Sequence, residues 1–316
     1  MLIKILDKAT LGNDLDFSVL EKYGNIEIYD CTDDTEIYSR IQDVEIIIIN
    51  KIKINEEVLK YANKLKLICV FATGYDNIDI GAARNKGIAV CNVPAYSTES
   101  VALLTVTCVL NLWTHLNEYS DFVSSGRYTA DGMANRLTPV YHEIKGKTWG
   151  IVGFGNIGKR VAEIATVLGA NVIVNKRVKT DGCRCVDLDT LCKESDIITL
   201  HCPLNEQTYH LINSGKIEMM KSNVVLVNEA RGNVTDETAV AEAVLNGKIG
   251  AFGSDVYSHE PFAQDHPFNQ IKHLENVCLT PHCAWAAYES RVRALEIVCE
   301  NISSFISGKN QNRVDK

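Results

Sequence analysis

A glycine-rich turn between a strand and a helix constrains this chain more than any other segment. Thr148–Val152 is an apolar, β-rich run that leads into Gly153-Phe154-Gly155-Asn156-Ile157-Gly158. Apolar residues then recur at helical spacing over Val161–Leu168, and Val172–Val174 has the pattern of the next strand. A GxGxxG motif in such a βαβ unit allows a tight turn, close approach of a pyrophosphate and close packing of the helix, whose N-terminus holds the anion. The segment therefore predicts a dinucleotide-binding domain rather than an ordinary glycine turn.

The end of the second strand bears on which dinucleotide is bound. NAD-binding domains place an Asp or Glu about 20 residues beyond the glycines, where it accepts hydrogen bonds from the ribose hydroxyls. Here the window reads Val174-Asn175-Lys176-Arg177, and no acidic residue precedes Asp181. A 2′-phosphate would meet the cations Lys176 and Arg177, so the sequence favours NADP(H), with NAD(H) as the second choice. The alternative interpretation of the two cations is a solvated strand end.

Length and composition bound the class of protein. A chain of 316 residues is long enough for two domains, and 46% hydrophobic and 23% charged residues are typical of a soluble enzyme. The net charge of −8 argues against nucleic-acid and anionic-membrane partners. Met1–Leu6 lacks a basic region and a cleavage site, which indicates a first strand rather than a signal peptide.

The cysteines give no sign of a metal site. Eleven cysteines are scattered along the chain, several of them inside predicted strands, as expected of small buried side chains in a reducing cytoplasm. Cys183-Arg184-Cys185 has the wrong spacing for a CxxC redox or zinc motif, and no second pair complements it. We therefore expect a cytoplasmic protein without a bound metal.

Strand and helix patterns alternate on both sides of the glycine motif. The N-terminal strands are expected at Leu2–Asp7, Ile26–Tyr29, Glu45–Asn50, Leu67–Val70 and Ala89–Cys91. Long apolar helices are expected at Val101–Leu116 and Ala284–Ile306, whereas Gly126–Glu143 has little periodicity and is expected to be a loop or arm. This alternation predicts an α/β protein built on parallel sheets.

Polar residues follow several of the predicted strands, at the edge where open α/β sheets bind ligands. Arg231, Glu260 and His282 follow successive strands near the predicted dinucleotide site. Each residue has an ordinary structural explanation, but together they indicate a reaction centre. Thr73 and Gly74 follow an N-terminal strand, where exposed N–H groups would suit a substrate carboxylate; a structural turn is equally compatible with that spacing.

These motifs together resemble the D-isomer-specific 2-hydroxyacid dehydrogenase family. The matching segments occur in the family's order along nearly the whole chain: Gly74-Tyr75-Asp76-Asn77-Ile78-Asp79, Gly153–Gly158, Asn228–Gly232, Asp255-Val256 with Glu260-Pro261, and Thr280-Pro281-His282. Two further segments resemble the glycerate dehydrogenase or hydroxypyruvate reductase branch: Asn92-Val93-Pro94 with Tyr96–Ser100, and His282-Cys283-Ala284-Trp285.

The resemblance implies two Rossmann-like, doubly wound parallel-sheet domains and a homodimer. A discontinuous substrate-binding (lid) domain would comprise residues 1–97 and 287–316, with the dinucleotide-binding domain, residues 98–286, inserted between them. It also implies hydride transfer between a nicotinamide cofactor and a small D-2-hydroxy acid or 2-oxo acid, with hydroxypyruvate or glyoxylate as the best candidates.

The resemblance assigns roles that suit the chemistry of each side chain. Arg231 would grip the substrate carboxylate and polarise the 2-keto oxygen, a bidentate task for a planar guanidinium. His282 would protonate that oxygen as hydride arrives, and Glu260 would orient the imidazole and favour its protonated form. Thr73, Gly74 and Trp285 would complete the substrate site together with Arg231 and His282.

The cofactor site implied by the resemblance extends beyond the glycines. Its remaining residues are expected to be Thr98, Phe154, Asn156, Ile157, Lys176, Arg177, Cys202, Pro203, Thr208, Glu229, Ala230, Asp255, His282 and Ala284. Asp255 would hold the nicotinamide side. The chain departs from the family at Glu229, where Thr or Val is usual, and at Leu103, where an acidic residue is usual; the consequence of either change stays open.

Other functions on the same scaffold remain alternatives. A dehydrogenase specific for D-lactate or another 2-oxo acid would share these motifs. A formate dehydrogenase would replace the Glu of the acid–base pair with Gln, so Glu260 argues against it. A cofactor-sensing corepressor would share the fold and even the catalytic residues. Turnover of a 2-oxo acid separates the enzymes from such a binding protein.

Overall fold

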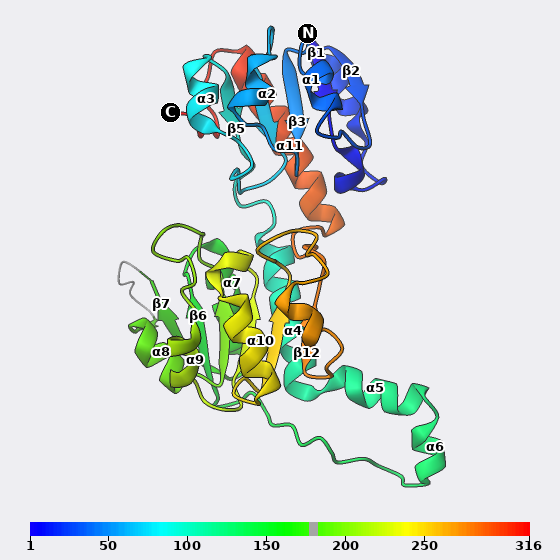
Figure 1. The fold of residues 1–316 in the computed structure, drawn as a ribbon, viewed down its shortest axis with the longest axis vertical. Helices are drawn as coiled ribbons and strands as arrows, with labels where there is room; N and C mark the ends of the chain where they lie inside the picture. Colours follow the sequence, from blue (N-terminus) through cyan, green and yellow to red (C-terminus); the bar gives the residue numbers. More distant parts are fainter. Residues whose placement is uncertain (177–182) are drawn as a thin grey trace. The chain divides into compact units, whose positions relative to one another are not determined.

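The computed structural model describes residues 1–176 and 183–316, and the chain divides into two compact units (Figure 1). The first unit comprises Met1–Ser97 with Ala286–Lys316, and the second comprises Thr98–Trp285. Ala286 thus lies in the first unit, one residue away from the boundary expected from the sequence. Each unit contains one sheet in which every pair of neighbouring strands is parallel. The predicted α/β fold class is confirmed.

The first unit is a five-stranded sheet of order β2-β1-β3-β4-β5. Its strands are β1 (Leu2–Ile5), β2 (Asn25–Ile28), β3 (Ile46–Ile49), β4 (Leu67–Val70) and β5 (Ala89–Cys91). Its α-helices are α1 (Glu36–Arg40), α2 (Glu56–Lys60), α3 (Ile80–Asn85) and α11 (Tyr288–Ile306), with the 3-10 helices η1 (Lys8–Leu11) and η2 (Phe17–Tyr23). All four isoleucines of β3 are fully buried because helices cover both faces of the sheet. Asn55 caps α2 by accepting a hydrogen bond from the Val58 N–H at 2.9 Å.

The second unit is a seven-stranded sheet of order β12-β11-β10-β9-β6-β7-β8. Its strands are β6 (Thr148–Val152), β7 (Asn171–Asn175), β8 (Arg184–Cys185), β9 (Ile197–Leu200), β10 (Val225–Asn228), β11 (Ala251–Ser254) and β12 (Val277–Leu279). Its helices are α4 (Thr98–Thr114), α5 (Leu116–Ser124), α6 (Arg127–Asp131), α7 (Asn156–Val167), α8 (Leu188–Glu194), α9 (Ser214–Met219) and α10 (Glu237–Leu245), with η3 (Gly232–Val234) and η4 (Pro267–Gln270).

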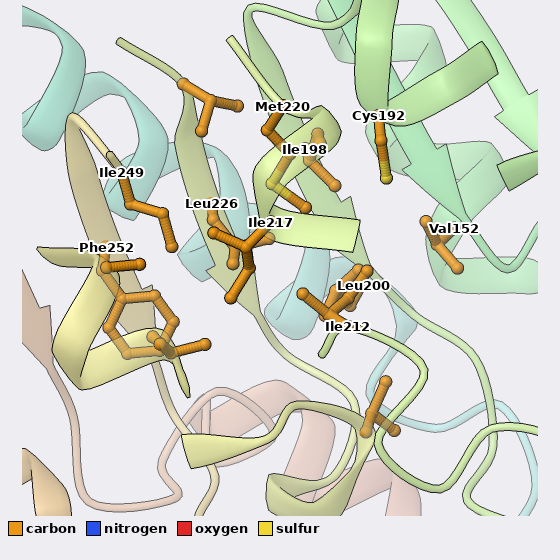
Figure 2. Close-up of a cluster of buried hydrophobic side chains, with 14 of the residues drawn as sticks. Val152, Cys192, Ile198, Leu200, Ile212, Ile217, Met220, Leu226, Ile249 and Phe252 are labelled. Atoms are coloured by element: carbon orange, nitrogen blue, oxygen red, sulfur yellow. The ribbon is translucent and has the colours of Figure 1, made fainter. Parts of the chain in front are cut away.

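Alternate residues of this second sheet face two separate cores. Trp149 and Ile151 pack with side chains of α4 and α7, whereas Val152 packs in a cluster with residues of α8, α9 and α10. Figure 2 shows part of the latter cluster, which includes Leu200, Leu226 and Phe252 from the sheet and Ile217 from α9. Strand residues two positions apart lie on the same face of the sheet. A residue that directly follows a strand therefore faces α4 and α7 when the residue two positions before it does.

The long helix expected at Val101–Leu116 is observed as α4, which begins three residues before and ends two residues before the expected bounds. The α4 helix ends at Thr114, because His115 adopts the left-handed conformation (φ 53°), and α5 then begins at Leu116. The expected arm beyond it contains the short helix α6, and α5 and α6 extend away from the second sheet (Figure 1). Among the described residues, no single helix is long and apolar enough to cross a membrane. The bent pair of α4 and α5, at 64°, meets that test only when the two are taken together.

Candidate active site

The glycine loop forms an open cradle at the N-terminus of α7. A Cβ on Gly158 would lie 2.1 Å from the carbonyl oxygen of Gly153, so this glycine is required for the helix to pack against the loop. A Cβ on Gly155, in contrast, would have no atom within 4 Å. Gly155 is the N-cap of α7, and no side chain caps the helix. Open space beside uncapped N–H groups fits the pyrophosphate of a dinucleotide.

The loop lies where the strand order of the second sheet reverses. β7 follows β6 on one side and β9 lies on the other, which is the crevice in which doubly wound sheets bind nucleotides. Beyond β7, the Lys176 Nζ lies 5.6 Å from the centre of the Phe154 ring, which belongs to the glycine loop. Arg177, the second cation expected to favour NADP(H), lies outside the described residues.

Glu260 and His282 form a hydrogen-bonded pair in the second unit. The Nδ1 of His282 lies 2.5 Å from Oε2 of Glu260, although the two residues are 22 positions apart in the chain. Both side chains are about a quarter exposed, so the pair is accessible to a small molecule. The Nε1 of Trp285 donates to the His282 carbonyl oxygen at 3.0 Å, which fixes the backbone at the histidine. A carboxylate on one imidazole nitrogen selects the tautomer in which the other exchanges protons.

Asp255 holds the loop that carries His282. Its buried carboxylate accepts hydrogen bonds from the Thr280 hydroxyl at 2.6 Å, the Cys283 N–H at 2.9 Å and the Ala284 N–H at 2.8 Å. The sequence predicts a contact with the nicotinamide for this residue, and this positioning role was not anticipated. The same loop is tied to α4, because the Ser100 hydroxyl donates to the Ala284 carbonyl oxygen.

A second buried network supports the loop that carries Glu260. Glu237 of α10 accepts hydrogen bonds from the Ser258 N–H at 2.8 Å and from the Ser258 hydroxyl, and its Oε2 lies 2.9 Å from Nε2 of His266. Glu237 and His266 are both less than a tenth exposed. This network is not predictable from the sequence, because Glu237 has the pattern of an ordinary acidic residue in the first turn of a helix.

Arg231 follows β10 at the same edge of the sheet. Its Nη1 donates to the Ala230 carbonyl oxygen at 2.9 Å, and Asn228 donates from its side chain to the Arg231 carbonyl oxygen at 3.0 Å. The backbone that presents the guanidinium is therefore fixed by the end of its own strand. The role predicted for Arg231 at the substrate remains a prediction.

The other residues predicted for the cofactor site lie in the segments that follow β9 and β10 and at the start of α4. The Thr208 hydroxyl donates to the Pro203 carbonyl oxygen at 2.7 Å, which closes the turn after β9. Burial raises the pKa of the Cys202 thiol to about 11. Thr98 is the first residue of α4. Glu229 is buried with Oε2 unpartnered, and burial and the Asp255 carboxylate raise its pKa well above its usual range.

Thr73 and Gly74 lie in the first unit, beyond β4. The Thr73 hydroxyl donates to the Val93 carbonyl oxygen at 2.8 Å, and the Thr73 carbonyl accepts from the Asn92 side chain at 2.8 Å. These two hydrogen bonds hold the turn in place, and within it Thr73 is exposed and Gly74 is partly exposed. Its contribution to a substrate site stays a prediction. Among the described residues there is no group of three or more His, Cys, Asp or Glu side chains that could hold a metal ion.

Two comparisons with whole proteins cover nearly all of this chain. It is 35% identical over 325 residues to the hydroxypyruvate reductase of Blautia hydrogenotrophica, with all of both chains covered. It is 36% identical over 280 residues to the glycerate dehydrogenase of Methylorubrum extorquens, covering 89% of this chain and 88% of the relative.

Solved structures give the same result for the fold. The D-lactate dehydrogenase of Aquifex aeolicus, in complex with NAD and lactic acid, matches with a TM-score of 0.88 and 30% identity over 100% of this chain and 99% of the other. An acyclic imino acid reductase in complex with NADPH and D-Arg matches with a TM-score of 0.87 and 30% identity over 99% and 100%. Residues 106–284 match the model of the D-isomer specific 2-hydroxyacid dehydrogenase, NAD binding domain. The chain therefore belongs to the D-isomer-specific 2-hydroxyacid dehydrogenase family.

Proposed function

We propose that this protein reduces a small 2-oxo acid, hydroxypyruvate or glyoxylate, to the corresponding 2-hydroxy acid, D-glycerate or glycolate, at the expense of NADPH. The observation that carries the proposal is the Glu260–His282 pair, 2.5 Å apart, in the same unit as an open glycine cradle for the cofactor. The names of the relatives, hydroxypyruvate reductase and glycerate dehydrogenase, support this substrate class.

The proposed chemistry divides between the bound nicotinamide, which supplies the hydride, and the side chains of this chain. His282 donates a proton to the 2-keto oxygen as the hydroxyl forms, and takes it back in the oxidation direction. Because Glu260 engages Nδ1, proton exchange occurs at Nε2, and the carboxylate stabilises the charged imidazolium. The loop contacts of Asp255 and Trp285 hold the ring in place through the reaction.

Arg231 binds the substrate carboxylate and draws electron density from the 2-keto oxygen. A guanidinium is suited to this task because it presents paired N–H donors in one plane and keeps its charge at all working pH values. The hydrogen bonds that fix its backbone to the end of β10 restrict where that plane can lie.

The preference for NADP(H) rests on the strand end beyond β7. Lys176 lies against the ring of Phe154 in the glycine loop, and the sequence offers no acidic acceptor for a ribose diol between Val174 and Arg177. The related structures include one with NADPH and one with NAD, so the choice rests on this chain's own residues.

The proposed assembly is a homodimer that uses the α5–α6 arm, residues 116–146. The arm exposes large apolar side chains that the second unit does not cover: Leu116, Val123, Met133, Leu137, Val140 and Tyr141. Leu137 is 76% exposed, so Leu137→Asp should leave the monomer folded and reduce the molar mass measured by light scattering towards that of a monomer. The eleven cysteines, none of which forms a disulfide, support a reducing cytoplasmic compartment.

A substrate panel tests the proposal. Oxidation of NADPH and NADH is followed by absorbance with hydroxypyruvate, glyoxylate, pyruvate and phenylpyruvate. We expect the highest kcat/KM with hydroxypyruvate or glyoxylate and NADPH. A preference for pyruvate would instead favour the D-lactate-specific alternative. Cofactor binding without turnover of any 2-oxo acid would contradict the enzyme and favour a cofactor-sensing binding protein.

A further inference from the structure

A row of side chains lies directly beyond the carboxyl edge of the second sheet. The register pairs Val152 with Leu200, Leu200 with Asn228 and Asn228 with Ser254, so the next row comprises Gly153, His201, Glu229 and Asp255. The ladder continues into this row, because the N–H groups of the last three residues donate to Val152, Leu200 and Asn228, respectively, at 2.7, 3.3 and 3.2 Å. Neighbouring side chains in this row therefore lie side by side.

The row faces α4 and α7 rather than α8–α10. Val227, two residues before Glu229, packs in the core cluster formed with α4 and α7. Two residues before His201, the Thr199 hydroxyl accepts a hydrogen bond from Trp149, which belongs to the same cluster. Because strand residues two apart share a face, His201 and Glu229 point to the side on which α7 presents the cofactor cradle.

His201 and Glu229 hold all of the unpartnered buried side-chain nitrogen and oxygen atoms within residues 1–176 and 183–316. These atoms are both ring nitrogens of His201 and Oε2 of Glu229. A buried polar group without a partner is costly, and native proteins keep few of them. Two such groups lie at the ends of neighbouring strands, beside the loop that fits a pyrophosphate. Their position indicates that these atoms bind a ligand.

Several acidic or neutral titratable groups lie around Glu229. The Asp255 carboxylate lies beside it, and the thiols of Cys108 on α4, Cys278 on β12 and Cys283 also interact with one or both carboxyl groups, as does the Tyr257 hydroxyl. Burial and Asp255 raise the pKa of Glu229 well above its usual range. Burial lowers the pKa of His201 to about 3, so its ring adds no charge near neutral pH.

On the basis of the function proposed above, we propose that Glu229 distinguishes the oxidised from the reduced cofactor. In a doubly wound sheet a dinucleotide binds across the switch point. With its adenosine half on the side of β7, its nicotinamide half would lie on the side of β9 and β10, where Glu229 follows β10. The oxidised ring is cationic and the reduced ring is neutral. Glu229 carries its proton in the free enzyme and beside the reduced ring, and it releases that proton to solvent when the cationic ring binds.

This assignment makes the affinity for the two forms of the cofactor depend differently on pH. A ligand that favours the ionised carboxyl binds more tightly as pH rises, whereas the neutral ring gains nothing from the ionisation. An opposite charge within about 4–6 Å lowers a carboxyl pKa by roughly one to three units, which corresponds to at least about tenfold in affinity. Glu229→Gln keeps the shape of the side chain and removes the ionisation.

The test measures dissociation constants for NADP⁺ and NADPH, and for NAD⁺ and NADH, with the full chain between pH 6 and 9. For the wild type, we expect the oxidised form to bind about tenfold more tightly at the high end while the reduced form changes little. In Glu229→Gln, the ratio of the two constants should shift by about tenfold or more against the oxidised form and lose its pH dependence. Glu242→Gln, an exposed change of equal charge on α10, should behave as wild type.

Two further measurements keep the result unambiguous. Calorimetry of NADP⁺ binding in buffers of different ionisation enthalpy counts the released proton in the wild type, so the inference is tested even if the variant does not fold. Cys278→Ser removes a neighbouring thiol whose pKa is lowered by its hydrogen bond with the Cys108 thiol, and it should leave the ratio unchanged. If Glu229→Gln keeps the pH-dependent ratio of the wild type, or if the wild type releases no proton, the role of Glu229 is contradicted but the proposed function is not. Failure of the wild type to bind either cofactor contradicts the proposed function as well.

Discussion

The two sheets of this protein differ in what occupies their switch points. In the first unit the strand order reverses between β1 and β3, and in the second it reverses between β6 and β9. Both are parallel, helix-covered sheets with N–H groups near the carboxyl ends of their strands. In the first unit, the Asp7 carboxylate lies buried at the switch point, whereas in the second unit the glycine loop leaves the equivalent region open.

Asp7 occupies the position that a bound anion would take. It follows β1, and its carboxylate accepts hydrogen bonds from the N–H groups of Asn50 at 3.1 Å, Lys51 at 2.7 Å and Ile52 at 3.3 Å, beyond β3. Burial outweighs these hydrogen bonds and raises the pKa of Asp7 above its usual value. A parallel α/β sheet can therefore bind a ligand at its switch point when the N–H donors there are open, and cannot when a side chain of the protein already accepts their hydrogen bonds.

The largest effect is expected at the acid–base pair, Glu260 and His282, which lies in the second unit. Because His282 exchanges a proton with the substrate oxygen, His282→Asn should lower kcat for hydroxypyruvate reduction by roughly 10²–10⁴-fold. Cofactor affinity should fall much less than kcat, because the Asp255 contacts that hold the loop involve backbone groups of residues 283 and 284 and the Thr280 hydroxyl. Steady-state kinetics and cofactor titration measure both quantities.

Glu260→Gln is the matched variant for this pair. It keeps a hydrogen-bond acceptor near Nδ1 but removes the charge that stabilises the imidazolium, so we expect a smaller loss of kcat together with a displaced pH profile. Retention of wild-type kcat by His282→Asn would place the proton donor elsewhere and would remove the chemical basis of the proposed function.

The next effect concerns the cradle itself. Gly155→Val should reduce cofactor affinity by at least about tenfold, because its side chain would enter the open space beside the N-terminus of α7. The fold should persist, since Gly155 has an ordinary extended backbone and a Cβ there meets no atom. Gly81→Ala on α3 is the control in the first unit and should bind cofactor as wild type does. Unchanged affinity in Gly155→Val would show that the pyrophosphate binds elsewhere.

The sequence predicts the cofactor-binding loop of the second unit, but it does not predict that Asp7 occupies the switch point of the first unit. The spacing of Gly153, Gly155 and Gly158 between an apolar strand and an amphipathic helix predicts a turn whose role is set by local geometry. Asp7 gives no such signal, because its partners lie over 40 residues away and the contact depends on how β1 and β3 pair. Hydrophobic alternation predicts that strands form, but not which ones become neighbours.

The same limit applies to the reaction centre. Arg231, Glu260 and His282 were recognisable as polar residues after strands, whereas the Glu237–His266 contact that supports the Glu260 loop is formed between distant segments. His115 shows a local version of the problem: its left-handed backbone ends α4 within an uninterrupted apolar pattern. The buried, unpartnered ring nitrogens of His201 could not be recognised from the sequence, because their burial depends on how the surrounding elements pack.

A smaller effect is expected from a substitution of Asp7 at the switch point of the first unit. Asp7→Asn should lower the free energy of unfolding of that unit by about 1–3 kcal/mol at pH 7, because the amide nitrogen would face N–H donors that lose an acceptor. Hydrogen exchange of the β1 and β3 amides measures this locally, and cofactor affinity should not change. Asp43→Asn is the control, since Asp43 forms only an exposed pair with Lys64. A loss of cofactor binding without faster exchange would contradict the structural role of Asp7.

The smallest expected effect is the response of the second unit to acid. His201 has a pKa of about 3 in the folded chain, lowered by burial from 6.5. As pH falls from 6.5, the unfolded chain therefore takes up a proton that the folded chain does not, and the free energy of unfolding decreases until pH approaches 3. His201→Phe removes this proton uptake, so between pH 6.5 and 5 the variant should lose about 1–2 kcal/mol less than the wild type.

Tryptophan emission during denaturant unfolding isolates this response, because Trp113, Trp149 and Trp285 are the only tryptophans and all lie in the second unit. The two proteins should differ at pH 5 and converge above pH 7, apart from a constant offset from packing. Parallel curves over the whole range would mean that the imidazole is charged in the folded chain. That result would require an acidic partner or bound water at His201, and the second switch point would then be partly closed by the protein itself, as the first is by Asp7.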